Sequence, residues 1–234
     1  MISCAPFRNP LCLALDVDSE DRALQVAKDL SGIVGGIKLG PRLVYRGGEA
    51  LVQKVAQYAP VFVDCKFFDI PSTMEGAVRT SFEAGASVVT VHALAGEEAL
   101  SGLAKVEREL SEKRPFRILA VTILTSWNQA SMPSNFRQQP IPEHVRELAE
   151  LVKRSGLKSI VCSAEEIQIL KDLELFMLTP GIRFPADSKG DQKRVMGPKE
   201  AIQAGSSTLV VGRPIFEATN PKQAAQQYLD AIRA

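Results

Sequence analysis

Short apolar runs recur along the whole chain, and each has the length of a single strand. Polar segments separate one run from the next. Runs of this length that end in polar segments are typical of buried strands that lead into loops. The pattern predicts eight strands, at residues 11–17, 33–39, 61–65, 87–92, 117–123, 159–162, 175–179 and 208–212.

The segments between these runs repeat their apolar residues with helical spacing, for example at residues 20–30, 73–84, 97–110, 142–155, 164–170 and 222–233. Alternating strands and helices indicate parallel strands joined by crossover helices. Eight such units in 234 residues predict an α/β fold of the (β/α)8 or TIM barrel type, with a doubly wound open sheet as the alternative. Gly85, Gly156 and Gly205 each precede a predicted strand, where we expect them to end helices.

Length and composition fit one domain. The chain has 234 residues, 45% of them hydrophobic, which is enough for one substantial core. We predict a short N-terminal extension at residues 1–10 and a barrel over residues 11–234. The extension contains Pro6, Arg8 and Pro10 and no sustained apolar stretch, so we expect neither a signal peptide nor a membrane span.

Charge and cysteine content limit which partners, metal sites and cellular compartments we expect. The 28 basic and 27 acidic side chains nearly cancel, which gives no electrostatic reason to expect binding to nucleic acid or a membrane surface. A small-molecule partner is favoured. The four cysteines show no C-x-x-C spacing, and two histidines offer few metal ligands. We therefore expect no disulfide scaffold, no metal site and a reducing, cytoplasmic location.

Polar side chains gather just after the predicted strands, where barrel enzymes keep their active sites. The most informative group is the run from Asp64 to Asp69. Because strand side chains alternate between faces, Asp64 and Lys66 are expected on one side and Cys65 on the other. Lys38 ends another predicted strand, so the two ends together allow an alternating Lys-Asp-Lys-Asp array. Such an array holds an ammonium ready to deliver a proton.

A structural salt-bridge network is the alternative interpretation of this group. Buried ion pairs add little net stability because the cost of desolvation offsets their attraction. A charged pair at the end of an apolar strand is therefore better explained by function.

A second group of residues suits an anion such as phosphate. Gly212 and Arg213 follow a predicted strand where backbone N–H groups and a helix start are available. Arg183 leads into a long polar loop, residues 184–192, which is placed to close over a bound phosphate. A surface salt bridge remains the alternative for Arg183.

Two further strand ends carry polar groups. Thr125 and Ser126 are candidates to recognise a polar ring, with loop capping as the alternative for either residue. For His92 we favour a structural hydrogen bond over a general-base role. The loop at residues 128–140 is long enough to form a second cover over the pocket, although surface variation would also explain it.

Taken together, six motifs resemble the orotidine 5′-phosphate decarboxylase family. They occur in order over nearly the whole chain. The motifs are L-A-L-D-V-D at residues 13–18, Lys38, D-x-K-x-x-D-I-P-x-T at 64–73, L-T-S at 124–126, T-P-G-I-R at 179–183 and V-V-G-R-P-I at 210–215. The first half of the third motif is shared with phosphosugar decarboxylases and aldolases, whereas I-P-x-T and T-P-G-I-R are typical of the orotidylate branch.

The resemblance implies loss of carbon dioxide from orotidine 5′-monophosphate to give UMP, without metal or cofactor. It implies that Lys66 protonates C6 of the pyrimidine, that Asp64 lies beside the departing carboxylate, and that Lys38 holds Asp64 and a ribose hydroxyl. Asp16 would also contact the ribose.

The resemblance also implies a homodimer with shared active sites. Asp69 and Thr73 would reach into the neighbouring subunit, and Ile70 and Pro71 between them are counted with the substrate-binding residues. The remaining predicted contacts are phosphate binding by Gln192, Gly212 and Arg213, and lining of the pyrimidine and phosphate ends by Thr125, Ser126 and Arg183.

Two other functions stay open at this point. One is a magnesium-dependent ketose-phosphate decarboxylase or aldolase of the same barrel type, although such enzymes place a carboxylate where this chain has Lys38. The other is a catalytically silent barrel that binds a phosphorylated metabolite. The intact charged set argues against that second possibility.

Overall fold

The computed structural model describes residues 5–185, 187 and 194–233. Eight parallel strands pair in chain order and close into a barrel through pairing of the first with the last. They are β1 (Leu11–Leu15), β2 (Gly36–Leu39), β3 (Val61–Phe67), β4 (Ala86–His92), β5 (Arg117–Val121), β6 (Ser159–Val161), β7 (Phe176–Thr179) and β8 (Thr208–Val211). The predicted (β/α)8 barrel is confirmed, and the open-sheet alternative is wrong.

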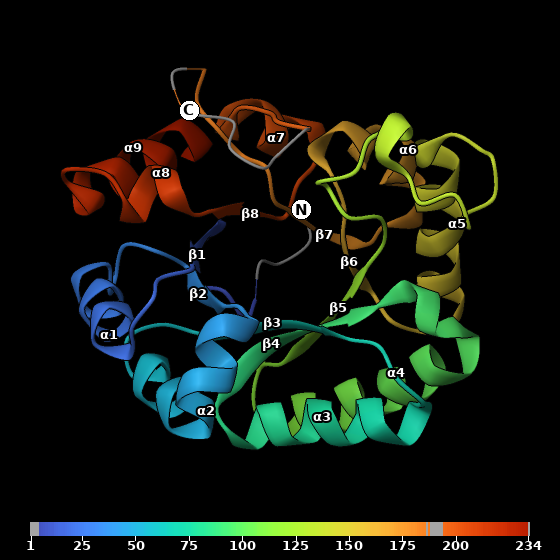
Figure 1. Ribbon diagram of the computed structural model, residues 1–234, viewed down its shortest axis with the longest axis horizontal. Coiled ribbons are helices and arrows are strands. Elements are labelled where there is room, and N and C mark those ends of the chain that lie inside the picture. The colour runs from blue at the N-terminus through green and yellow to red at the C-terminus, as the bar shows by residue number, and fades with distance from the viewer. Residues whose placement is uncertain (1–4, 186, 188–193, 234) are drawn as a thin grey trace.

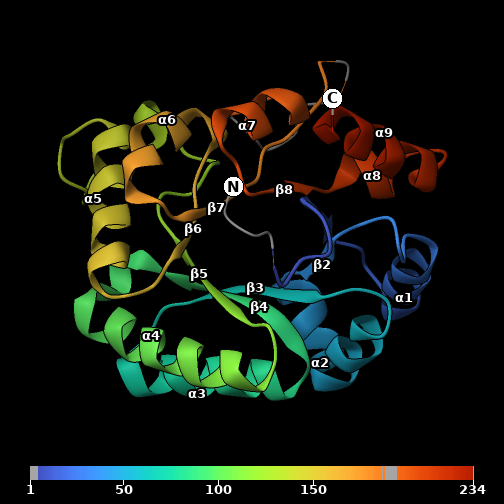
Figure 2. The ribbon, with the colours of Figure 1, turned by 180° about the vertical axis from the view of Figure 1, so that it is seen from behind.

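Helices form a ring around these strands, as Figures 1 and 2 show from opposite sides. The α-helices are α1 (Glu20–Asp29), α2 (Pro41–Ala56), α3 (Pro71–Glu83), α4 (Gly96–Lys113), α5 (Ile141–Arg154), α6 (Ile167–Leu170), α7 (Pro198–Ala204), α8 (Arg213–Phe216) and α9 (Pro221–Arg233). Short 3-10 helices are η1 (Ala93–Ala95), η2 (Gln129–Ser131), η3 (Ala164–Glu166) and η4 (Lys171–Leu173). The helix predicted at residues 164–170 is thus a 3-10 turn followed by one α-helical turn.

Local sequence explains where the helices lie and end. In α5, Ile141, Val145, Ala149 and Val152 are buried, and their spacing of three and four residues places them on one face. Gly85, Gly156 and Gly205 have φ values of 103°, 90° and 119°, a region that side chains other than glycine rarely adopt. Their predicted role after the helices is confirmed.

The N-terminal segment closes one end of the barrel. Phe7 is 3% exposed and packs edge-on against Phe62 inside the barrel, with ring centroids 6.4 Å apart. A Cβ atom at position 36 would lie 2.4 Å from the Phe7 ring, so this approach requires Gly36. The carboxyl ends of the strands lie at the other end of the barrel, which leaves that end for a ligand. Among the described helices, none is both long and apolar enough to cross a membrane.

Candidate active site

A cavity of 650 Å³ opens at the carboxyl ends of the strands. Seven of the eight strands, all except β4, contribute residues to it from their carboxyl-terminal parts or from the segments that follow them, as the barrel architecture predicts. The residues predicted from sequence that line it are Asp16, Lys38, Asp64, Lys66, Thr125, Ser126, Arg183, Gly212 and Arg213. Nine side chains or backbone positions from distant parts of the chain therefore share one cavity.

Asp64 lies between two lysines at one side of this cavity. Its Oδ2 is 3.1 Å from Lys38 Nζ, and its Oδ1 is 2.8 Å from Lys66 Nζ. The Asp64 and Lys38 side chains are 12% and 17% exposed, whereas Lys66 is 39% exposed. The predicted convergence of these three residues is confirmed, and Lys66 is the member most open to a ligand.

The electrostatics of this cluster keep opposite charges side by side. Burial alone would raise the pKa of the Asp64 carboxyl, but Lys38 and Lys66 outweigh it and hold the pKa well below its ordinary range. Burial likewise opposes the charge on Lys38, yet Asp64 raises the pKa of that ammonium. The carboxylate and the Lys38 ammonium are therefore both charged at neutral pH.

The backbone at Lys66 departs from a regular strand. Lys66 has a φ of 50°, in the left-handed region. Val63 pairs with Val89 and Phe67 with Val91, so three residues of β3 stand opposite the single residue Thr90. Simple alternation along β3 therefore does not explain why Lys66 meets Asp64, although the predicted contact is present.

Asp16 lies at the rim, where the sequence interpretation missed two neighbours. Arg42 Nη1 is 2.7 Å from Asp18 Oδ1, and Arg42 Nε is 3.6 Å from Asp16 Oδ1. All three side chains line the cavity and are more than half exposed. Arg42 lies in the first turn of α2. Its contacts with Asp16 and Asp18 depend on the start of this helix lying beside the segment that follows β1.

The opposite side of the cavity carries two further guanidinium groups, Arg183 and Arg213. Arg213 is the first residue of α8 and directly follows Gly212. A Cβ atom at position 212 would lie only 3.1 Å from the Ala14 carbonyl oxygen, so glycine fits this close approach. Helix starts of this kind present backbone N–H groups to anions. Gln192, the remaining predicted phosphate contact, lies outside the described residues.

A buried ion pair joins the loops on this side. Arg194 is bonded to Glu166, and the two side chains are 10% and 2% exposed. Arg194 Nη2 also donates to the Leu124 carbonyl oxygen at 3.2 Å, immediately before Thr125 and Ser126. The loops after β5, β6 and β7 thus meet at one guanidinium. No spacing rule in the sequence indicates this contact, because the three loops are distant along the chain.

Four predicted site residues lie outside this cavity. Asp69, Ile70 and Thr73 are exposed, Pro71 is partly exposed, and none of these described residues lines the cavity of its own chain. The Asp69 carboxylate accepts the Ile70 N–H at 2.7 Å. The apolar Ile70 side chain is 64% exposed. Asp69 and Ile70 lie in the loop between β3 and α3, and Pro71 and Thr73 lie in the first turn of α3, all at the surface of the subunit.

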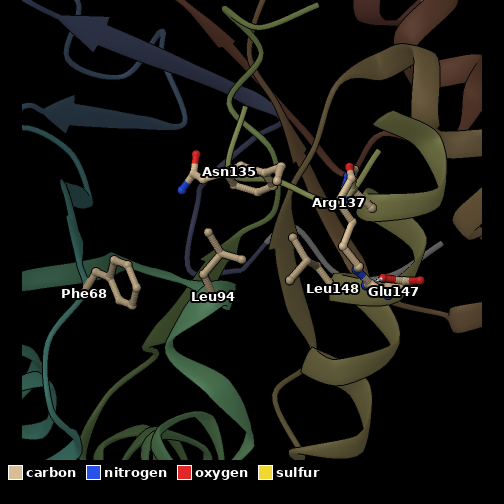
Figure 3. Close-up of a pocket in the computed structure, with 8 residues that line it drawn as sticks. Phe68, Leu94, Asn135, Arg137, Glu147 and Leu148 are labelled. Carbon is tan, nitrogen blue, oxygen red and sulfur yellow. Dashed lines mark hydrogen bonds and ion pairs between the residues drawn. The ribbon is translucent and has the colours of Figure 1, made fainter. Parts of the chain in front are cut away.

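A second, apolar hollow of 430 Å³ lies beside this loop. Figure 3 shows Phe68 and Leu94 on one wall and Leu148 with the Arg137–Glu147 ion pair on the other. The loop at residues 128–140 supplies Asn135, Phe136 and Arg137 to this hollow, which we call the side groove. No residue of this loop lines the main cavity. Residues 128–140 therefore do not cover that cavity, contrary to the expectation from the sequence.

His92 has the structural role that the sequence interpretation favoured. Its Nδ1 accepts the Leu94 N–H at 3.3 Å, and its ring lies 5.8 Å from that of Phe68. Burial, assisted by the nearby Lys66 ammonium, lowers the pKa of His92. At neutral pH the His92 ring is therefore uncharged, and its bond to the Leu94 N–H caps the start of η1.

Comparisons with known proteins agree on one family. The profile described as "Orotidine 5'-phosphate decarboxylase / HUMPS family" matches residues 9–228. The chain is 37% identical over 229 residues to orotidine 5'-phosphate decarboxylase of Carboxydothermus hydrogenoformans, covering 95% of each chain. It is 38% identical over 232 residues to the enzyme of that name from Trichlorobacter lovleyi, covering 97% of this chain and 96% of the relative.

Solved structures show the same likeness. The crystal structure of orotidine 5'-phosphate decarboxylase from Lactobacillus acidophilus superposes with a TM-score of 0.83 at 31% identity, over 97% of this chain and all of that one. A structure of the Methanocaldococcus jannaschii enzyme in complex with the inhibitor BMP has a TM-score of 0.78 at 24% identity, over 97% of this chain and 99% of that one. Because the identity to the Methanocaldococcus jannaschii enzyme is 24%, this second comparison shows a shared fold only.

Proposed function

The chain belongs to the orotidine 5′-phosphate decarboxylase / HUMPS family, and on that premise we propose that it is an orotidine 5′-phosphate decarboxylase, a carboxy-lyase. It converts orotidine 5′-monophosphate to UMP and carbon dioxide in pyrimidine biosynthesis. The observation that carries this proposal is the Lys38–Asp64–Lys66 cluster at one side of a cavity with two arginines at the other.

The chemistry requires an environment for a very basic carbanion. The bond between C6 and the carboxylate carbon breaks, its electron pair stays on C6, and carbon dioxide leaves. Lys66 then donates a proton from its ammonium to C6 and stabilises the developing negative charge before the transfer. Lys66 suits this role because it is the most exposed member of the cluster.

Asp64 would act beside the substrate carboxylate. It is charged at neutral pH because Lys38 and Lys66 outweigh the effect of burial on its pKa. Its negative charge orients both ammoniums and disfavours a second carboxylate next to it. Departure of neutral carbon dioxide relieves that repulsion, while the fixed ammonium charges favour the carbanion.

The remaining cavity residues bind the rest of the nucleotide. Lys38 and Asp16 are assigned to the ribose, and Thr125 with Ser126 to the pyrimidine edge. Arg183 and Arg213, with the backbone at Gly212, face the position assigned to the phosphate. Gln192 stays a proposed phosphate contact. Binding energy from the phosphate, remote from C6, then helps to hold the ring against Lys66.

We further propose a homodimer in which each subunit completes the active site of the other. Asp69 and Thr73, with Ile70 and Pro71 between them, are assigned to the partner's site because they project away from the cavity of their own chain. The apolar surface beside them supports a second copy as the occupant of the side groove: Phe68 is 60% exposed and Leu94 is 41% exposed. Such surface is normally covered in an assembly.

Magnesium-dependent chemistry on a ketose phosphate is disfavoured. Magnesium prefers oxygen ligands, and the magnesium-dependent enzymes that the sequence also resembles place a carboxylate at the position of Lys38, at the end of β2. There the chain presents the Lys38 ammonium, 3.1 Å from Asp64 Oδ2. Positive charge at this position competes with a metal cation for the same carboxylate.

The direct test of the proposed function is an assay of the purified protein after treatment with EDTA. We expect orotidine 5′-monophosphate to be converted to UMP at the same rate with and without the chelator. Loss of activity with EDTA and its recovery with magnesium, or turnover of a ketose phosphate only, would contradict the proposal.

Shared active sites are tested by mixing two inactive variants. In co-expressed Lys66→Ala and Asp69→Ala chains, a hybrid dimer has one site with both residues intact. Random pairing of the two chains should therefore restore about a quarter of wild-type activity. The matched control pairs Lys66→Ala with Asp64→Ala, which lie in the same site, so it restores none. Absence of recovery in the first pair, despite association of its chains, would rule out sharing.

A cytoplasmic location completes the proposal. Cys12, Cys65 and Cys162 are free thiols in the described part of the chain, as expected in a reducing compartment. Fractionation of cells that express the protein would test this assignment.

A further inference from the structure

We propose that Thr90 is a positioning residue for decarboxylation, one that holds the Asp64 carboxylate and the Lys66 backbone in a single geometry. This inference rests on the proposed function and concerns a residue that does not itself line the substrate cavity. The observations that lead to it are the irregular pairing of β3 with β4, two hydrogen bonds and complete burial.

The Thr90 hydroxyl bonds to both residues at once. It donates to Asp64 Oδ1 at 2.8 Å and accepts the Lys66 backbone N–H at 2.9 Å. Lys66 Nζ lies 2.8 Å from the same Asp64 oxygen. One hydroxyl therefore uses its donor and an acceptor position to join the carboxylate to the backbone that carries the ammonium.

The backbone at Lys66 requires such support. A φ of 50° is unfavourable for a residue with a side chain, and strained residues persist only where their surroundings hold them. Regular pairing of the two strands would not hold Lys66, because Asp64, Cys65 and Lys66 together face Thr90 alone. The Lys66 N–H consequently bonds to a side-chain oxygen in place of a backbone carbonyl. The threonine hydroxyl replaces the regular pairing at the point where β3 bulges.

Burial makes the geometry rigid. Thr90 has no exposed surface, and its χ1 is restricted because the side chain is β-branched. A hydroxyl held in this way fixes the distance between Asp64 and the Lys66 backbone in the free enzyme. Proton transfer is sensitive to such placement, since a displacement of about 1 Å can cost about 100-fold in rate.

The test is a set of three variants with matched shapes. Thr90→Val removes the hydroxyl and keeps the branched side chain, Thr90→Ser keeps the hydroxyl, and Thr208→Val is the control. Thr208 is also fully buried in a strand, but its hydroxyl bonds to the Ser207 carbonyl oxygen at 2.9 Å, away from the cavity. Steady-state kinetics on orotidine 5′-monophosphate and thermal unfolding are measured for all three and for the wild type.

We expect Thr90→Val to lower kcat about 10- to 100-fold, with KM within about threefold of wild type because no substrate contact is lost. Thr90→Ser should recover kcat to within about threefold. Thr208→Val should lose thermal stability to a similar degree and keep its turnover. Only a positioning role produces this combination, because a general loss of packing would affect both valine variants alike.

Other outcomes would overturn the inference. If Thr90→Val has the kcat of Thr208→Val, or if Thr90→Ser fails to restore turnover, the hydroxyl does not position the cluster. Failure of the proposed function is a separate result, since the wild type would then form no UMP at all.

Discussion

The two sides of the main cavity are built in different ways. At the ends of β2 and β3, charged side chains contact one another directly: Asp64 lies within 3.1 Å of both lysine ammoniums, and it also accepts a hydrogen bond from Thr90 of β4. At the ends of β5, β7 and β8, the polar groups come from loops and from the first turn of α8. One side is set within the strands, whereas the other depends on how loops pack.

This difference suits a division of labour between chemistry and binding. A proton donor must be placed before the substrate arrives, because reorganisation during the reaction adds to the barrier. Phosphate binding tolerates and even uses adjustable loops, since the energy released on binding can close them. The comparison therefore predicts that changes on the first side reduce kcat and that changes on the second side raise KM.

The largest effect is expected from Lys66→Ala. Loss of the proton donor should lower kcat by about 100- to 10,000-fold, while the affinity for a nucleotide analogue changes much less. Lys105→Ala, an exposed lysine on α4, serves as the control and should leave both quantities unchanged. Turnover by Lys66→Ala near the wild-type rate would remove Lys66 from the chemistry and abolish the contrast between the two sides.

A smaller effect, on KM and not mainly on kcat, is expected from Arg213→Ala. Removing one charged donor should raise KM for orotidine 5′-monophosphate about 10- to 100-fold, corresponding to the usual value of a hydrogen bond to a charged group. The kcat value should fall less than KM rises. Reaction of the unphosphorylated nucleoside, orotidine, should be unaffected. If both substrates lost the same factor, Arg213 would not bind the phosphate.

Most of the fold could be predicted from the sequence because of two regularities. Apolar runs mark strands, and parallel strands bring all their carboxyl ends to one end of the barrel. The same topology explains why Lys38 and Asp64, which are far apart in the sequence, were expected to meet. Short elements were harder to predict, and residues 164–170 form a 3-10 turn and one α-helical turn because a capping box between Ser163 and Glu166 starts the segment tightly.

The parts of the site that escaped prediction depend on register and loop packing. Thr90 could be assigned only once the bulge opposite it was known, because regular alternation treats it as one more residue of a buried strand. Arg42 and Arg194 act through partners that local spacing does not indicate. Likewise, residues 128–140 were expected to cover the cavity, but they form a wall of the side groove. Packing of Phe136 against Trp127 and His144 holds the loop there.

The central claim, that Lys66 and Asp64 act on the ring carbon that loses carbon dioxide, is tested most directly by a crystal structure with a bound UMP analogue. We predict that the Lys66 ammonium points at C6 of the pyrimidine, within hydrogen-bonding distance of a substituent there, and that Asp64 lies beside it. A nucleotide bound in the cavity with its C6 remote from both side chains, and with Lys66 directed into solvent, would contradict the claim.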